Sequence, residues 1–170
     1  MYFDTYEAFL RWVLVTTSKN VKMSLQEASF SQPQVGSASA VVIVLARKNL
    51  YIEDGYVEPL LRRDGDNLFE NVVRNIYTEY TSPMSEVEIE AFADKQCYFA
   101  SLNLMNSAAI LGIDSCPIGG FEAKKIIEIL NIDEKKFSIS LVIALGYRAD
   151  EAKKKSRHDF NDVVSFVNSQ

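Results

Sequence analysis

The segment 116–121 reads CPIGGF and carries two adjacent glycines, Gly119 and Gly120. Because glycine has no side chain, a planar ligand can approach such a backbone closely, and its exposed N–H groups can donate to an electronegative ring edge. The same residues also suit a helix stop, a proline-stiffened strand and a Gly-Gly turn. The local pattern alone leaves both interpretations open.

A run of cations near the C-terminus, 153–157 (KKKSR), is a second candidate for binding. The point charge of Lys155 and the fork of Arg157 suit a phosphate dianion. A cationic tail is, however, more often plain solvated surface. The residues themselves decide for neither interpretation.

A third candidate is the segment 30–40 (FSQPQVGSASA), which leads into an apolar run. Ser31 offers a hydroxyl and Gln34 a long amide arm, and both can contact a polar ligand. Phe30 and Pro33 equally suit plain packing at the start of a helix.

The scarcity of histidine and cysteine argues against several kinds of chemistry. His158 is the only histidine, so the sequence supports neither a zinc site of the usual kind nor a Ser-His-acid or Cys-His set. Cys97 and Cys116 fit neither a disulfide framework nor a metal-ligand spacing, and we interpret them as reduced thiols of a cytoplasmic protein. We assign no catalytic acid, base or nucleophile, and no metal ligand.

The composition is that of an ordinary globular chain. It has 170 residues, 48% of them hydrophobic, a net charge of −5 and a pI near 5.0. This length predicts one domain over 1–170. The negative charge argues against nucleic acid as a partner. The segment 1–11 is too short for a secretory signal or a membrane span, and no other stretch reaches spanning length without charges, so we expect no membrane partner.

Apolar runs predict strands at 12–16, 40–46 and 138–147, with a short β-like segment at Cys116. The run 40–46 (AVVIVLA) is continuously apolar and β-branched, which indicates a central strand covered on both faces. We expect an α+β fold in which these strands form a central, mainly antiparallel sheet flanked by helices.

Helical periodicity predicts helices at 2–11, 19–29 and 122–130, a short one starting at Pro33, and two short helices or one broken helix within 56–80. The longest helix begins with a capping box, Ser85 with Glu88, and runs to Leu111 before Gly112 stops it. From 97 onward it is apolar nearly all round, which indicates burial, plausibly at a subunit interface. The apolar residues of 160–167 also need a packing partner.

The order of these parts resembles the nitroreductase family: a long buried helix, then LGIDSCPIGGFE, an amphipathic helix, a strand ending in ALGYR, and KKKSR. The resemblance implies that FMN binds between two subunits and that NAD(P)H is a co-substrate. It implies backbone contacts to the isoalloxazine ring from Pro117, Ile118, Gly119 and Gly120. It also implies that Lys155 and Arg157 reach the flavin phosphate, that Ser31 and Gln34 contact the pyrimidine side and ribityl chain, and that Phe30 lines the substrate mouth.

The resemblance further implies a long helix at a homodimer interface and a C-terminal strand, 162–167, exchanged onto the partner's sheet. Two departures from the family stand out. Ser31 takes a place where Asn is common, and the family's Ser-Ser-x-Asn-x-Gln-Pro-Trp and Arg-x-Ser-x-(Arg or Lys) motifs are absent before Trp12. We therefore interpret the chain as an N-terminally shortened member that lacks the usual flavin-phosphate segment.

The implied activity is ping-pong hydride transfer from NAD(P)H, through FMN, to a small-molecule acceptor such as a nitroaromatic or a quinone. Each charge-assisted hydrogen bond to the phosphate contributes about 1.5–3 kcal/mol, so the loss of several is serious. The alternative is a degenerate nitroreductase-fold dimer with weak or no flavin binding and a binding or structural role.

Overall fold

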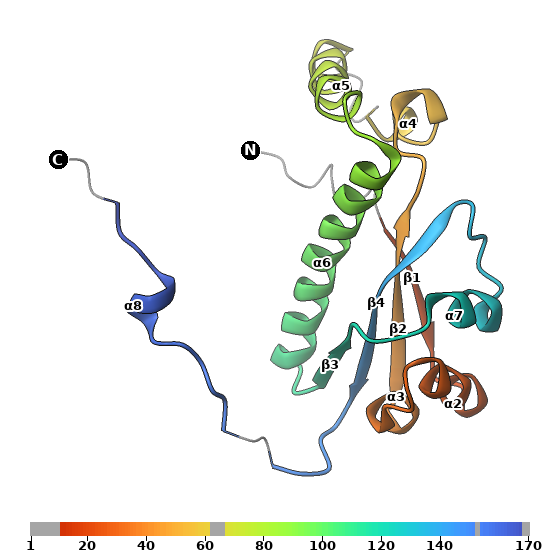
Figure 1. The fold of residues 1–170 in the computed structure, drawn as a ribbon, viewed down its shortest axis with the longest axis vertical. Coiled ribbons are helices and arrows are strands. Elements are labelled where there is room, and N and C mark those ends of the chain that lie inside the picture. Colours follow the sequence, from red (N-terminus) through yellow and green to blue (C-terminus); the bar gives the residue numbers. More distant parts are fainter. Residues whose placement is uncertain (1–10, 62–66, 152–153, 168–170) are drawn as a thin grey trace.

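Four antiparallel strands form the centre of the molecule (Figure 1). The computed structural model describes residues 11–61, 67–151 and 154–167. The strands are β1 (Arg11–Thr16), β2 (Ala40–Arg47), β3 (Asp114–Ile118) and β4 (Phe137–Gly146), in the order β1-β2-β4-β3. Every neighbouring pair of strands is antiparallel, so the prediction of an α+β fold with a mainly antiparallel sheet is confirmed.

The central strand β2 divides two hydrophobic cores, as its continuous apolar run predicts. Val42 and Val44 face the long helix α6 (Glu86–Ile110), while Val41 and Ile43 face the opposite layer. That layer consists of α2 (Lys19–Ala28), α3 (Pro33–Ser37) and α7 (Ala123–Leu130). Successive side chains of a strand point to opposite faces, so one strand supplies both cores.

The segment between β2 and α6 contains two helices in the range where helices were predicted, and residues 62–66 between them lie outside the described part of the chain. It contains a 3₁₀ turn (Ile52–Asp54), α4 (Glu58–Leu61) and α5 (Asn67–Thr81). The hydroxyl of Tyr77 on α5, which is only 2% exposed, donates to the buried Leu50 carbonyl at 2.6 Å. This bond fixes α5 to the end of the sheet.

Both ends of α6 follow the predicted capping pattern. The Ser85 hydroxyl accepts from the Glu88 backbone N–H, and the Glu88 carboxylate accepts from the Ser85 backbone N–H at 2.8 Å. At the other end Gly112 has a φ of 74°, Gly112 N–H donates to Ala109 O, and Ile113 N–H donates to Ala108 O. These two bonds form a Schellman motif, so the helix stops where glycine can take the left-handed conformation.

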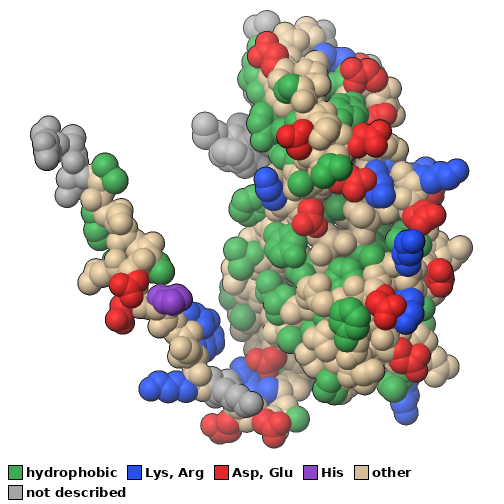
Figure 2. Space-filling view, in the orientation of Figure 1, with side chains coloured by type: hydrophobic (Ala, Val, Ile, Leu, Met, Phe, Trp, Pro, Cys, Tyr) green, Lys and Arg blue, Asp and Glu red, His purple; other side chains and the backbone are tan. Residues whose placement is uncertain are grey.

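Only one side of α6 is buried within a single chain. Ala93 and Cys97 are fully buried against the sheet, whereas Tyr98, Phe99 and Leu102 are exposed. Burial of this exposed side at a subunit interface stays a prediction. Figure 2 shows hydrophobic side chains gathered where α6 lies in Figure 1.

The segment after β4 leaves the sheet and runs away from the body (Figure 1). It contains one helical turn, α8 (Phe160–Val163), and no strand in the part of it that the structure describes. The predicted strand at 162–167 is thus absent within this chain, and its exchange onto a partner stays a prediction. The predicted helix at 2–11 lies almost wholly outside the described residues. None of the helices described is long and apolar enough to cross a bilayer.

Candidate functional site

The segment CPIGGF extends from the edge strand β3 into an open loop. Ile118 is 2% exposed and packs in the core between the sheet and α2, whereas Pro117 lies on the α6 side and is exposed. Gly119 and Gly120 follow, and both are exposed. A Cβ built on Gly119 would meet no atom within 4 Å, so the space beside this backbone is free.

The two glycines offer hydrogen-bond donors. Within the part of the chain that the structure describes, no group accepts a hydrogen bond from the N–H of Gly119 or Gly120. Exposed backbone N–H groups that are held in place can bind an acceptor atom without a charged side chain.

A turn at Phe30 and Ser31 lies beside the glycine pair. Both residues have left-handed φ angles, 52° and 57°, a conformation that non-glycine residues rarely adopt. The Phe30 ring is 63% exposed, and its Cδ2 lies 3.5 Å from the position that a Cβ on Gly120 would take. The structure thus brings together two predicted site segments that are about 90 residues apart in the sequence.

Gln34 lies at a cavity of about 310 Å³ next to this turn. The cavity is open to solvent and is lined by the loop between α3 and β2, by Ser115 and Cys116 of β3, and by the end of β4. The amide of Gln34 donates to Gln32 Oε1 at 3.4 Å, while Ser31 is exposed to solvent. The cavity and the glycine pair therefore adjoin the same edge strand.

An ion pair between Asp114 and Arg148 lines this cavity, and no sequence signal predicted it. The Arg148 guanidinium donates to both Asp114 carboxylate oxygens, at 2.6 and 2.8 Å. These hydrogen bonds hold the pKa of Asp114 below its ordinary value and raise that of Arg148. The pair joins the start of β3 to the end of β4.

Lys155 and Arg157 are not brought to the cavity within this chain. Both are exposed on the segment that runs away from the sheet in Figures 1 and 2. Arg157 donates to the neighbouring Ser156 carbonyl at 2.7 Å.

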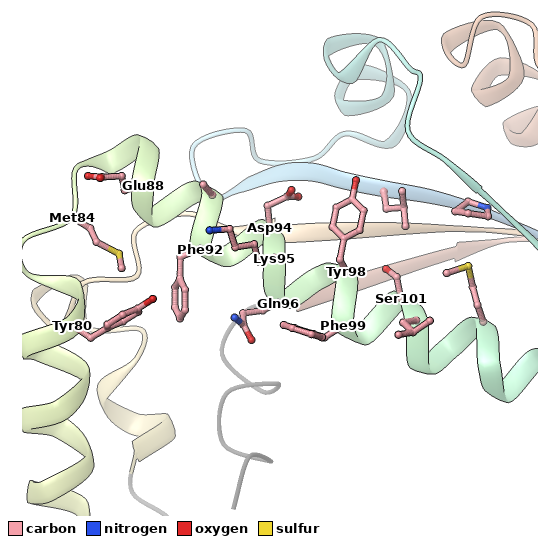
Figure 3. A pocket seen from close by; sticks show the side chains of 15 residues that line it. Tyr80, Met84, Glu88, Phe92, Asp94, Lys95, Gln96, Tyr98, Phe99 and Ser101 are labelled. Carbon is pink, nitrogen blue, oxygen red and sulfur yellow. The ribbon is translucent and has the colours of Figure 1, made fainter. Parts of the chain in front are cut away.

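An apolar groove of about 970 Å³ runs along α6 and reaches Pro117. At one end the rings of Tyr80 and Phe92 meet edge to face, with centroids 5.5 Å apart (Figure 3). Phe99 and Leu102 line it further along the helix. Across the described residues, no three His, Cys, Asp or Glu side chains form a group that could hold a metal ion.

Comparisons with known proteins agree with this fold. The sequence model of the Nitroreductase family matches residues 9–147. A protein of Staphylococcus epidermidis assigned as an NAD(P)H nitroreductase is 36% identical over 168 residues, which cover 91% of this chain and 76% of that protein. The chain belongs to the nitroreductase family.

Solved structures show the same fold. A nitroreductase-like protein from Streptococcus mutans superposes with a TM-score of 0.83 at 18% identity, covering 97% of this chain and 79% of its own. A protein from Exiguobacterium sibiricum, assigned as a nitroreductase and solved in complex with FMN, has a TM-score of 0.78 at 21% identity, with 95% and 83% covered.

Proposed function

We propose that the protein is an FMN-dependent NAD(P)H oxidoreductase of the nitroreductase type. One observation carries the proposal: the backbone N–H groups of two exposed residues, Gly119 and Gly120, have no acceptor among the described residues. The space beside Gly119 is free, and Phe30 lies beside Gly120 on this segment between the sheet and α7. This arrangement fits the electronegative edge of an isoalloxazine ring. We assign ring contacts to Pro117–Gly120, polar contacts to Ser31 and Gln34, and the substrate mouth to Phe30.

When bound, FMN would supply the hydride chemistry of a ping-pong reaction between NAD(P)H and a nitroaromatic, quinone or similar acceptor. The residues of this chain would bind FMN and orient it. Backbone N–H groups at the ring edge would favour the negative charge gained on reduction, and they need no reorganisation where the fold holds them in place. No acid, base or nucleophile from the protein is required.

The relatives support the choice of cofactor and co-substrate. The assignments of the staphylococcal relatives include NAD(P)H, and the Exiguobacterium protein was solved with FMN. We extend both to this chain as part of the proposal, with a small molecule as electron acceptor and the cytoplasm as the compartment.

We further propose that the active form is a homodimer. The exposed side of α6 presents Tyr98, Phe99 and Leu102, and the tail presents Phe166 and Val167, which are 77% and 95% exposed. Monomers rarely leave contiguous apolar surface of this kind uncovered. In the dimer we assign Lys155 and Arg157 to the flavin phosphate and residues 162–167 to exchange onto the partner's sheet.

A second candidate function follows from the position of the cations. Because Lys155 and Arg157 lie away from the cavity in the single chain, the phosphate half of the site is not assembled there. A nitroreductase-fold dimer with weak or no flavin binding, and a binding or structural role, accounts for that placement.

An FMN titration separates the two functions. Quenching of FMN fluorescence should saturate with the wild-type protein, and replacing Lys155 and Arg157 together with Ala should weaken binding at least tenfold, about 1.4 kcal/mol. The matched control removes two cations from exposed helical positions, Lys19→Ala with Lys124→Ala, and should bind like the wild type. No saturable binding by the wild type would reject the oxidoreductase and leave the second function.

A further inference from the structure

The side-chain amide of Gln32 connects the two segments of the proposed ring site. Its Nε2 donates to Gly120 O at 2.9 Å and to Ser29 O at 3.0 Å. Its Oε1 accepts from Gln34 Nε2 at 3.4 Å. Both N–H groups of the amide are therefore used, one on each segment.

The glycine pair needs such a connection because glycine backbones are permissive. Two consecutive glycines would otherwise sample many φ and ψ combinations, and their N–H groups would point in many directions. Ile118, buried in the core, anchors the segment on one side, and the Glu122 N–H, which donates to Ala28 O at 2.7 Å, anchors it on the other. Among the described residues, Gln32 is the one whose side chain donates to the Gly120 carbonyl between these anchors.

Backbone hydrogen bonds hold the Phe30–Ser31 turn in place. Ser31 N–H donates to Gln26 O at 2.9 Å, and Gln32 N–H donates to Ser29 O at 3.1 Å. Residues in the left-handed region persist only where surrounding bonds over-determine them. The second donor of the Gln32 amide also goes to Ser29 O, so it stabilises this turn directly.

We propose that Gln32 is a positioning residue of the flavin site: its amide locks the Gly120 carbonyl to the Phe30–Ser31 turn and so directs the glycine N–H groups toward the ring edge. The proposal rests on the proposed function. It predicts that loss of the donor frees the glycine pair, weakens FMN binding, and weakens binding of reduced FMN most, since the ring edge is then negatively charged.

Two variants remove the donor while preserving the length of the side chain, Gln32→Met and Gln32→Glu. Neither can donate to the two carbonyls, and only the second adds a charge. Asn20→Asp is the charge control, because Asn20 is exposed on α2 about 15 Å from the turn by helical rise.

The first measurement uses the FMN-free protein. In the wild type, ¹⁵N relaxation should give order parameters of about 0.85 for the amides of Gly119 and Gly120. In Gln32→Met the same amides should have order parameters below about 0.6. Because no flavin is present, this result does not depend on the proposed function.

The second measurement uses FMN. Both Gln32 variants should bind oxidised FMN at least tenfold more weakly and should lower the midpoint potential of bound FMN, whereas Asn20→Asp should match the wild type. A further tenfold loss for reduced FMN corresponds to about 30 mV for two electrons. If glycine order parameters, FMN affinity and potential all match the wild type in Gln32→Met, the positioning role is refuted.

Failure of the proposed function looks different. In that case the wild type itself shows no saturable FMN binding, whatever the order parameters of the glycines. Should Gln32→Glu fail to fold, the uncharged Gln32→Met still provides all three measurements.

Discussion

Alanine at Gly119 and alanine at Gly112 should change stability in opposite directions, although the chemical change is the same. A Cβ at either position would meet no atom within 4 Å, so neither variant creates a clash. The two glycines differ in backbone conformation. Gly112 has a φ of 74°, whereas Gly119 lies outside the left-handed region.

The magnitudes follow from two effects. Either alanine restricts the unfolded chain, which stabilises the native state by about 0.4–1 kcal/mol. At Gly112 the left-handed backbone costs an alanine about 1–2 kcal/mol, and at Gly119 that cost is absent. The unfolded-state effect cancels between the variants, so their free energies of unfolding should differ by about 1–2 kcal/mol, with Gly119→Ala the more stable.

Urea unfolding at a fixed protein concentration measures this difference. With a slope of about 2 kcal/mol per M, the midpoints should lie about 0.5–1 M apart at unchanged slope. Equal midpoints, or a lower midpoint for Gly119→Ala than for Gly112→Ala, would refute the reasoning.

Three further predictions concern the fold around the site. Tyr77→Phe should lower the free energy of unfolding by about 1–3 kcal/mol, because the buried Leu50 carbonyl loses its donor; urea unfolding tests this, and no change would contradict it. Ser85→Ala should cost about 1 kcal/mol through the lost helix cap, seen as a lower thermal midpoint. Arg148 lowers the pKa of Asp114, so their pairing stabilises the fold above the ordinary Asp pKa of about 3.9 and is lost as pH falls through the lowered value. Thermal midpoints of Asp114→Asn and the wild type should therefore differ at pH 6 and converge at strongly acidic pH; a constant gap would contradict this.

Local sequence signals predicted most of the fold. The capping box at Ser85 and the glycine at 112 predicted the two ends of α6. Both act through hydrogen bonds to residues within one or two turns, so the local sequence is enough to identify them. The apolar run 40–46 predicted a central strand, since a strand covered on both faces has no polar side. The start of the helix predicted at 19–29 is also correct, since α2 begins at Lys19.

Features that depend on distant residues could not be predicted. Gln32 acts on Gly120, 88 residues away, and nothing beside it in the sequence distinguishes it from any surface glutamine. Lys22 is buried and donates to Ala38 O, which contradicts the usual preference of lysine for solvent. The side of α6 that is exposed in the single chain has an apolar sequence, and such a pattern does not reveal whether the same chain or a partner covers it.

The candidate site was predictable in part. The sequence identified CPIGGF and the Phe30 segment, and the structure places them side by side. Their roles toward FMN, and those of Lys155 and Arg157, rest on the family resemblance and stay predictions.

The most direct test of the account is anaerobic reduction of the bound cofactor. The purified protein, loaded with FMN, is mixed with NADH or NADPH while the visible flavin absorbance is followed, and a nitroaromatic or quinone is then added. We predict that one of the nicotinamides bleaches the absorbance and that the acceptor restores it. Bound FMN that neither nicotinamide reduces, or a protein that binds no FMN, would contradict the proposed activity.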